Sequence, residues 1–378
     1  MKETESKQSF YRDRKRIAEG RDFDMADIAI IGAGSWGTAL SVLLHNNGHH
    51  ITVWSALEPE IRMLKECHEQ KEKLPGVILP EDMIFTTDLN AAMKDKDVLV
   101  LAVPSPFTRS TAKQMAPFTK QGQIIVNVAK GIEEATLMTL SEIIEQEIPQ
   151  ANVAVLSGPS HAEEVGKGIP TTIVVGSKDK KTAEYLQTVF MSEVFRVYIS
   201  ADVLGIELGA ALKNVVALAA GVADGLGYGD NTKAALITRG IAEIARLGIH
   251  MGGRLETFYG LTGIGDLIVT CASMHSRNRR AGILIGKGAT MDEAMAEVKM
   301  VVEGVMGGTL PWTLVLIGVF AAVIVEILGI PVMAFAVGLY LPIYLSTPIF
   351  IGGVIRWFLE NKKKFADDAS RKDFIDRG

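Results

Sequence analysis

The chain has 378 residues, a formal net charge of -5 and two cysteines. Its length allows two or three domains, because one hydrophobic core rarely extends beyond about 250–300 residues. The charge gives no large basic field for nucleic acid, although local arginines and helix ends still bind small anions. Cys67 and Cys271 lie far apart, so the sequence indicates neither a disulfide framework nor a metal site, and a reducing, cytosolic setting fits.

The first 24 residues are charged and have no apolar core. We therefore expect no secretory signal there and interpret residues 1–24 as a solvated, disordered tail. Met25 opens a strand-like run and is an alternative start of the protein.

Residues 25–201 alternate strand-like and helical stretches, starting with a strand, a glycine turn, a helix and a second strand. Buried strands are predicted at 98–105, 124–131, 153–160, 171–177 and 194–200, and a helix at 135–146. This order is typical of an α/β fold with a Rossmann-type, doubly wound parallel sheet, which makes residues 25–201 a dinucleotide-binding domain.

The strand-like runs stop near residue 202, and alanine-rich helical sequence follows. The clearest helical stretches are 204–221, 232–247 and 291–302. We therefore predict a second, all-α substrate domain over residues 202–305, which the chain enters directly through a helix.

A G-x-G-x-x-G motif, formed by Gly32, Gly34 and Gly37, stands between the first strand and the first helix. In this position the first glycine allows a tight turn, the second lets a pyrophosphate approach the backbone, and the third lets the helix pack on the sheet. The helix N-terminus then faces the phosphates. Dinucleotide binding is favoured over a structural turn because strand and helix flank the motif.

The second strand is predicted to end at Trp54, where such domains usually carry an acid for the ribose or a base for a 2′-phosphate. Here Ser55, Ala56 and Leu57 follow, with Glu58 next. NAD is slightly favoured because nothing basic stands at hand, but NADP stays open.

Two loops follow neighbouring predicted strands at the carboxyl edge of the sheet, where ligands bind in this class of fold. Lys130 follows one strand, and Gly158 and Ser160 follow the next. The ammonium and the backbone N–H groups suit an anion. Taken alone, either loop is as well explained by turn formation.

Lys213 and Asn214 lie inside a helix of otherwise small and apolar residues. Burial or nearby cations would lower the pKa of such a lysine toward the range that acid–base catalysis requires. The alternative is a surface lysine whose stem covers apolar neighbours.

Asp266 is a candidate partner for this lysine or for a substrate hydroxyl. Ser276, Arg277 and Asn278, followed by two further arginines, form a compact donor cluster that suits a phosphate. A basic helix start on the surface is the alternative. The histidines, including His161 and His275, have no metal-ligand spacing and are interpreted as loop or surface residues.

Seven motifs occur in the order and approximate spacing of bacterial NAD(P)-dependent glycerol-3-phosphate dehydrogenases. They are GAGSWGTAL, NVAKGIE, SGPSHAEEV, ALKNVVALAAG, NTKAALITRG, GDLIVTC and SRNRR. The chain resembles this family from about Ala26 to Val305. The family continues with soluble helices after this point and the chain does not, so we predict that its helical domain is truncated.

The resemblance implies reversible hydride transfer between NAD(P)H and dihydroxyacetone phosphate, giving sn-glycerol 3-phosphate for phospholipid synthesis. It implies that Lys213 exchanges the proton, with Lys130, Asn214 and Asp266 as further catalytic residues. The substrate contacts that it implies are Lys130, Gly158, Ser160, Lys213, Asp266, Ser276, Arg277 and Asn278. The cofactor contacts are Gly32, Gly34, Ser35, Trp36, Gly37, Lys130, Ala162, Arg277, Val301 and Glu303. The hypothesis that the substrate is another hydroxy acid is weaker, because Arg277 favours a substrate with a phosphate group.

The sequence changes character after Val305: from Met306 to Ile355 the only charged residue is Glu326. Residues 310–328 and 332–359 are each long enough to cross a bilayer. Two passes would return the lysines at 362–364 to the side of the enzyme, as the positive-inside rule prefers. A buried core helix is the alternative, but the length of this nearly uncharged stretch argues against it.

Residues 306–378 also resemble part of the oligopeptide transporter family, in LPWTLVLIG, VEILGIPVMAFAVGLYLPI and LSTPIFIGGVIRW. We expect a cytoplasmic enzyme portion with membrane association through residues 310–359. The alternative is a membrane-anchored or inactive chimera that carries a transporter fragment. Association into a homodimer is left open.

Overall fold

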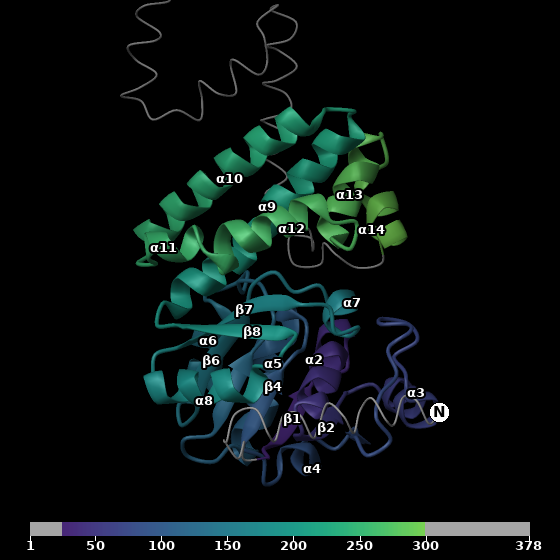
Figure 1. The fold of residues 1–378 in the computed structure, drawn as a ribbon, viewed down its shortest axis with the longest axis vertical. Coiled ribbons are helices and arrows are strands. Elements are labelled where there is room, and N and C mark those ends of the chain that lie inside the picture. The colour runs from purple at the N-terminus through teal and green to yellow at the C-terminus, as the bar shows by residue number, and fades with distance from the viewer. Residues whose placement is uncertain (1–24, 299–378) are drawn as a thin grey trace, which may run out of the picture. The chain divides into compact units, whose positions relative to one another are not determined.

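The computed structural model describes residues 25–298 (Figure 1). The predicted tail at 1–24, the predicted spans at 310–328 and 332–359, and the predicted cofactor residues Val301 and Glu303 lie outside the described residues.

An eight-stranded sheet forms the first part of the described chain, in the order β3-β2-β1-β4-β5-β6-β7-β8. Its strands are β1 (Asp27–Ile31), β2 (His50–Trp54), β3 (Ile84–Thr86), β4 (Val98–Leu101), β5 (Ile124–Asn127), β6 (Asn152–Ser157), β7 (Thr171–Ser177) and β8 (Phe195–Ser200). The chain runs outward from β1 to β3 on one side and from β4 to β6 on the other. The glycine motif follows β1 at this switch point, and the predicted Rossmann-type doubly wound fold is confirmed.

The sheet is predominantly parallel, as predicted, and its last two strands run in the opposite direction. All pairs from β3 to β6 are parallel, but β7 pairs antiparallel with β6, and β8 pairs parallel with β7. The connection between β6 and β7 contains only the one-turn helix α7 (Ala162–Val165). A one-turn helix is too short to return the chain along the face of the sheet to its opposite edge, so the chain turns back at the same edge.

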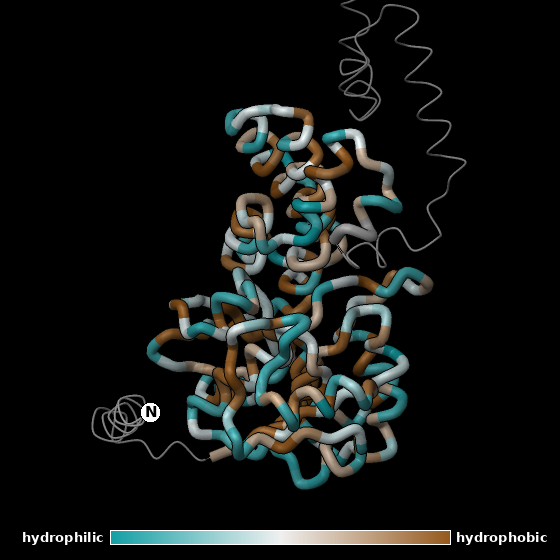
Figure 2. The backbone as a smooth tube through the Cα atoms, turned by 90° about the vertical axis from the view of Figure 1, so that its right-hand side faces the viewer, coloured by the Kyte–Doolittle hydropathy of each residue, from teal (hydrophilic) through white to brown (hydrophobic). Residues whose placement is uncertain are grey.

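Helices cover both faces of the sheet, and strand side chains alternate between two cores. Ile28 and Ile30 belong to one core, whereas Ala29 and Ile31 belong to the other. The first core also includes residues of α2 (Ser35–Asn46), α3 (Glu58–Cys67) and α8 (Lys180–Phe190). The second includes residues of α4 (Leu89–Met93), α5 (Thr108–Met115) and α6 (Leu140–Glu147). Figure 2 shows hydrophobic backbone in the interior of this part and hydrophilic turns around it.

Several predicted boundaries move at the carboxyl edge. The strands predicted at 98–105, 124–131 and 153–160 end at Leu101, Asn127 and Ser157, and β4 leads into the 3-10 helix η1 (Ser105–Phe107). The helix predicted at 135–146 begins only at Leu140, because Thr139 and Glu142 form a capping box that fixes its start. A second 3-10 helix, η2 (Ala116–Phe118), follows α5, and β3 was not predicted. The residues that were predicted as strand ends, but that follow the observed strands, form the loops that carry the candidate site.

The chain becomes helical after β8. The elements are α9 (Val203–Gly225), α10 (Asp230–His250), α11 (Leu255–Phe258), the π-helix η3 (Leu261–Gly265), α12 (Asp266–Ala272), α13 (Arg277–Gly286) and α14 (Met291–Val298). Helix α9 contacts α10, α12 and α13, and it also contacts β6 and β7. Figure 1 shows α9 within this group of helices.

Glycines allow α9 and α13 to approach very closely. A Cβ atom added at Gly221 would lie 2.1 Å from the Arg279 carbonyl oxygen, and one at Gly282 would lie 2.2 Å from the Leu218 carbonyl oxygen. Among the described helices only α9 is long and apolar enough to cross a membrane, with a mean hydropathy of 1.6. Its place at the centre of the helical part accounts for that composition, because core helices are apolar on most sides.

Candidate active site

The glycine motif forms a cradle at the start of α2. Gly32 has φ +123°, and a Cβ atom there would lie 2.7 Å from the Ala102 carbonyl oxygen. A Cβ atom at Gly37 would lie 2.1 Å from the Gly32 carbonyl oxygen, so both positions require glycine. A Cβ atom at Gly34 would meet nothing within 4 Å. That open space above the N-terminal turn of Ser35 and Trp36 fits the pyrophosphate of a dinucleotide.

Polar side chains meet just beyond β2. The buried Glu60 carboxylate accepts hydrogen bonds from the Ser55 hydroxyl (2.5 Å), the Gln70 amide (2.9 Å) and the Lys73 ammonium (2.5 Å). Gln70 also donates to the Ala33 carbonyl oxygen (2.9 Å), so this cluster adjoins the glycine loop. The expectation that nothing basic stands near this strand end is therefore wrong. Lys73 lies too far from Trp54 along the chain for the sequence to reveal it.

Three charged side chains meet where the sheet edge faces the helical part. The Lys130 ammonium, on the loop after β5, donates to Asp266 Oδ2 (2.7 Å) and to the Gly158 carbonyl oxygen (3.0 Å). The Lys213 ammonium, on α9, donates to Asp266 Oδ1 and to Thr270 Oγ1 (2.8 Å). Lys213 is 5% exposed and Asp266 is 1% exposed. The structure thus brings together three residues that the sequence placed far apart.

Burial and mutual charge set the protonation of this cluster. Burial, followed by the positive charge of Lys130, lowers the pKa of Lys213 to about 7, although Asp266 opposes the shift. Burial alone would raise the pKa of the Asp266 carboxyl, but the two ammonium groups outweigh it and lower that pKa. Asp266 is therefore a fixed negative charge, and Lys213 is the group of the cluster that changes protonation near neutral pH.

Thr270 is a member of this cluster that the sequence did not suggest. Its hydroxyl lies 2.5 Å from the Asp266 carbonyl oxygen one helical turn earlier. The signal was present in the spacing, since residues four apart on a helix share a face. Asn214 is half-buried next to Lys213, and within residues 25–298 the structure records no hydrogen bond of its side chain. The structure does not bring Asn214 into the cluster, because successive helical residues point in different directions.

The loop after β6 faces the segment that precedes α13. The Ser160 hydroxyl donates to the Gly158 carbonyl oxygen (2.9 Å), and Ala162 is buried at the start of α7. The rings of His161 and His275 lie 5.5 Å apart between centroids, and both residues lie outside helices and strands, as the sequence predicted. Burial lowers the pKa of His161. This contact places the Gly158–Ser160 loop beside the predicted phosphate cluster.

Some side chains of the predicted phosphate cluster are hydrogen-bonded within the protein, and others are free to bind a ligand. Ser276 is the N-cap of α13 and accepts from the Arg279 N–H (3.2 Å). The Arg279 guanidinium donates to Asp224 Oδ2 over 2.7 and 2.9 Å, which fixes α13 to α9. Arg277 is exposed and Asn278 is half-buried, and no ion pair of Arg277 is recorded in the described part of the chain. The polar groups of these two residues, like that of the exposed Arg280, remain open for a ligand among the described residues.

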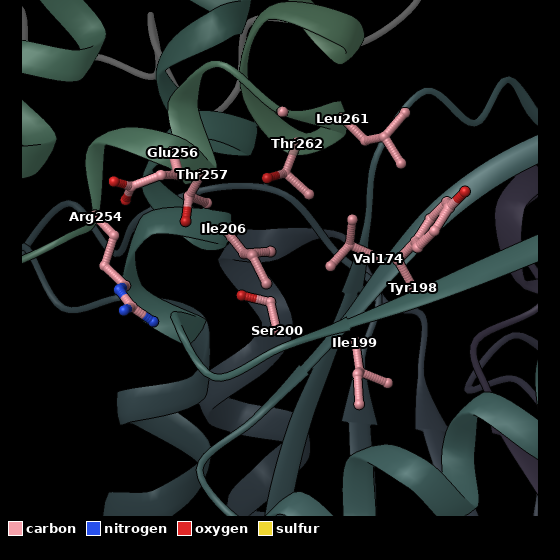
Figure 3. A pocket seen from close by; sticks show the side chains of 11 residues that line it. Val174, Tyr198, Ile199, Ser200, Ile206, Arg254, Glu256, Thr257, Leu261 and Thr262 are labelled. Atoms are coloured by element: carbon pink, nitrogen blue, oxygen red, sulfur yellow. The ribbon is translucent and has the colours of Figure 1, made fainter.

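A cavity of about 360 Å³ lies elsewhere, between the β7–β8 edge and the α11–η3 segment (Figure 3). Its lining residues are Val174, Tyr198, Ile199, Ser200, Ile206, Arg254, Glu256, Thr257, Gly260, Leu261 and Thr262. None of the predicted site residues lines it. Within residues 25–298 there is no group of three His, Cys, Asp or Glu residues that would hold a metal ion.

Family models match almost the whole described chain. Residues 27–183 match the NAD-dependent glycerol-3-phosphate dehydrogenase N-terminus, and residues 202–310 match the corresponding C-terminus. Residues 288–374 match the OPT oligopeptide transporter protein model. The second and third matches overlap, so the change of character near Val305 coincides with a change of family.

Individual relatives and solved structures agree with the dehydrogenase matches. The chain is 69% identical over 281 residues to glycerol-3-phosphate dehydrogenase [NAD(P)+] of Agathobacter rectalis, which covers 74% of this chain and 84% of that protein. It is 52% identical over 284 residues to the protein of the same name from Bacillus subtilis, with 74% and 82% covered. The crystal structure of glycerol-3-phosphate dehydrogenase from Coxiella burnetii superposes with a TM-score of 0.72 at 33% identity, covering 81% of this chain and 91% of that one. With the glycine cradle and the buried lysine cluster in place, this chain belongs to the family of NAD(P)-dependent glycerol-3-phosphate dehydrogenases.

Proposed function

We propose that this chain interconverts dihydroxyacetone phosphate and sn-glycerol 3-phosphate with NAD or NADP as the hydride carrier, and that Lys213 is the acid–base residue. The observation that carries the proposal is the buried contact of Lys213 with Asp266 and Thr270. It gives an amine whose pKa of about 7 suits proton transfer to and from an alcohol near neutral pH.

The residues of the cluster divide the work. When bound, the nicotinamide dinucleotide supplies or accepts the hydride. Lys213 Nζ gives its proton to the oxygen on which negative charge develops, and it takes that proton back in the reverse direction. The Lys130 ammonium stabilises the same oxygen, because it is held by Asp266 and the Gly158 carbonyl oxygen before the substrate arrives. Asp266 stays ionised and orients both lysines, while Asn214 is a proposed further contact of the oxyanion.

The substrate phosphate is proposed to lie at the start of α13. Arg277 and Asn278 supply open donors there, and Ser276 fixes the helix end that carries them. Gly158 and Ser160 close the opposite side, since the contact of His161 with His275 holds the two segments together. Gripping the phosphate positions the carbonyl carbon for the transfer.

The proposed cofactor contacts surround the glycine cradle. The phosphates would lie against Gly32, Gly34 and Gly37 and the first turn of α2, at Ser35 and Trp36. Lys130, Ala162, Arg277, Val301 and Glu303 are the other proposed contacts. Lys73 is a basic group close to the end of β2, where such domains discriminate NAD from NADP, but its pairing with Glu60 leaves both cofactors in the proposal.

We further propose that residues 25–201 and 202–305 are the dinucleotide-binding and substrate domains of a cytoplasmic enzyme. Its product would serve phospholipid synthesis, and a homodimer is the proposed alternative to a monomer. Residues 306–378 are the proposed membrane-associated segment, through 310–359. The match of residues 288–374 to a transporter model also favours a second candidate, a membrane-anchored or inactive chimera that carries a transporter fragment.

The direct test is NADH oxidation by the full chain with dihydroxyacetone phosphate, compared with Lys213→Ala. Loss of a positioned acid–base residue is expected to lower kcat by about 10²–10⁴-fold. Lys178→Ala is the matched control, because Lys178 is an exposed lysine that lies outside the site and pairs with Glu145 within the described part of the chain. Undiminished turnover of Lys213→Ala would refute the assignment of Lys213.

A further inference from the structure

Glu207 is a buried carboxylate that the proposed reaction does not use. It lies on α9, 6% exposed, six residues before Lys213. Oε1 accepts from the Ser141 N–H (2.9 Å) and from the Asn127 side-chain amide (3.3 Å), and Oε2 accepts from the Ser141 hydroxyl. All three donors belong to the sheet part. Glu207 therefore joins the helix that carries Lys213 to the opposite side of the site.

The side chain of Asn127 links Glu207 to the loop that carries Lys130. Its side-chain amide also donates to the Ala129 carbonyl oxygen (3.2 Å), and its Oδ1 accepts from the Ala129 N–H (3.1 Å). Asn127 is the last residue of β5 and is fully buried, so its side chain fixes the turn that leads into Lys130. Glu207 thus holds the start of the loop through Asn127, and Asp266 holds the Lys130 ammonium at the other end.

The second support of the same carboxylate is the N-terminus of α6. Ser141 is the second residue of that helix, after the Thr139 cap, so Glu207 satisfies one of its free N–H groups. Burial raises the pKa of Glu207, and the Ser141 donors oppose the shift. Ser141, Asn127 and Thr139 supply its hydrogen bonds, and residues 25–298 place no cation on it; such a buried carboxyl group is costly unless its geometry serves a purpose.

We propose that Glu207 is a positioning residue, which through Asn127 and Ala129 sets the place of the Lys130 ammonium relative to Lys213. The proposal rests on the proposed function, because it assigns Glu207 to the geometry of that reaction. The role of Glu207 goes beyond the proposed function, since Glu207 touches neither lysine. Six helical residues separate Glu207 from Lys213 by about 9 Å.

The test compares Glu207→Ala, Glu207→Gln and Asn127→Ala in the full chain. Glu207→Ala and Asn127→Ala release the loop, so kcat is expected to fall by up to about 10²-fold with the KM values nearly unchanged. Glu207→Gln keeps an acceptor for Ser141 and Asn127 and is expected to restore most of the activity. Asn127→Ala leaves the Ser141 bonds of Glu207 intact, so it separates the link to the loop from the stability of the fold.

Asp202→Ala is the matched control for a merely structural role. Asp202 is a second buried carboxylate at the start of α9, but it accepts from Gly205 N–H, Arg254 N–H and the Thr257 hydroxyl, which are all away from the Lys130 loop. This variant is expected to lower Tm and leave kcat unchanged. In a Lys130→Ala background, Glu207→Ala is expected to cost little more activity, because both act through one ammonium group.

A titration that needs no turnover separates this proposal from the proposed function. Lysine-selective ¹⁵N labelling follows the Lys213 Nζ signal with pH, assigned by its loss in Lys213→Ala. Since the charge of Lys130 is one cause of the lowered pKa of Lys213, Glu207→Ala and Asn127→Ala are expected to move that titration to higher pH. A folded Glu207→Ala or Asn127→Ala variant with an unmoved Lys213 titration overturns the proposal. A wild-type chain that does not reduce dihydroxyacetone phosphate overturns only the function, because the titration still decides the role of Glu207.

Discussion

At the scale of single residues, the site depends on one carboxylate shared by two lysines. Asp266 receives Lys130 on one oxygen and Lys213 on the other, and Thr270 supports both Lys213 and the Asp266 backbone. Three side chains with two positive charges and one negative charge leave an excess of one positive charge in a buried place. Lys213, the more deeply buried ammonium, is the group that loses its proton most readily. The cluster therefore changes its protonation near neutral pH.

The pKa of Lys213 predicts opposite pH profiles for the two directions. Reduction needs the protonated amine, so kcat/KM for dihydroxyacetone phosphate is expected to fall tenfold per unit above about pH 7. Oxidation of glycerol 3-phosphate needs the neutral amine and is expected to fall below the same pH. Initial rates in both directions over about pH 5.5–9.5 measure this. A rate of reduction that stays constant up to about pH 9.5 would contradict the shift, because the ordinary pKa of lysine is 10.5.

Removing the carboxylate predicts a pH-dependent loss of stability. Asp266→Asn leaves the buried Lys213 ammonium and the partly exposed Lys130 ammonium without a counter-charge, which is expected to cost about 3–5 kcal/mol of unfolding free energy. The folded-state pKa of Lys213 then lies below its unfolded value. The unfolded chain binds more protons, so stability rises with pH, and the loss is expected to be larger at pH 6 than at pH 9. Urea unfolding at both pH values measures it.

The control for this change is an exposed ion pair. Asp95→Asn removes the partner of Lys120, and both side chains are largely exposed. Exposed pairs contribute little to stability, so no measurable loss is expected at either pH. An equal loss for the two variants would show that Asp266 is no more than an ordinary surface partner.

At the scale of elements, the turn from β1 into α2 separates folding from binding. A Cβ atom at Gly34 meets nothing in the protein, whereas one at Gly37 meets the Gly32 carbonyl oxygen. Gly34→Ala is therefore expected to keep the wild-type Tm and to weaken NADH binding by about tenfold or more, which is about 1.4 kcal/mol. Gly37→Ala is expected to lower both. Fluorescence titration with NADH and thermal unfolding measure the pair, and normal NADH binding by Gly34→Ala would contradict the cradle.

The sequence predicted the elements better than it predicted their ends. The apolar run at 171–177 coincides with β7, because a buried strand is written in consecutive apolar residues. The run at 124–131 was too long because Ala129 is compatible with a strand pattern, and the run at 153–160 was too long because the prediction passed over Pro159, which cannot donate a ladder hydrogen bond. The reversed direction of β7 was hidden because an apolar strand reads the same in either direction. Short β3 carried too little pattern to be recognised.

The candidate site was predicted in part for the same reason. Lys130, Lys213 and Asp266 stood out because charge is unusual at a sheet edge or inside an apolar helix. Glu60, Lys73 and Glu207 were missed, because their partners are distant in the chain and nothing local marks them. The roles of Asn214, Arg277 and Asn278 stay predictions.

At the scale of the whole molecule, the question is whether the full chain associates with a membrane. If residues 310–359 associate with a membrane, the full chain is expected to need detergent for extraction, and a version that ends at Val305 is expected not to. Both are expected to oxidise NADH with dihydroxyacetone phosphate if the dehydrogenase portion is active. Fractionation with and without detergent, followed by the assay, measures this. Full extraction of the active full chain without detergent would contradict membrane association.

Helix α9 has a consequence for synthesis of the chain. The helices that cover it, α10, α12 and α13, all follow it in sequence, and the last of them ends about 60 residues later. At ordinary translation speeds of roughly 5–20 residues per second, a ribosome needs roughly 3–12 seconds to make them. For that interval the emerging chain presents an apolar helix whose contacts with α10, α12 and α13 have not yet formed, while β6 and β7 are already available to pack against it. During synthesis, the face of α9 that these three helices cover in the folded protein is therefore expected to be exposed.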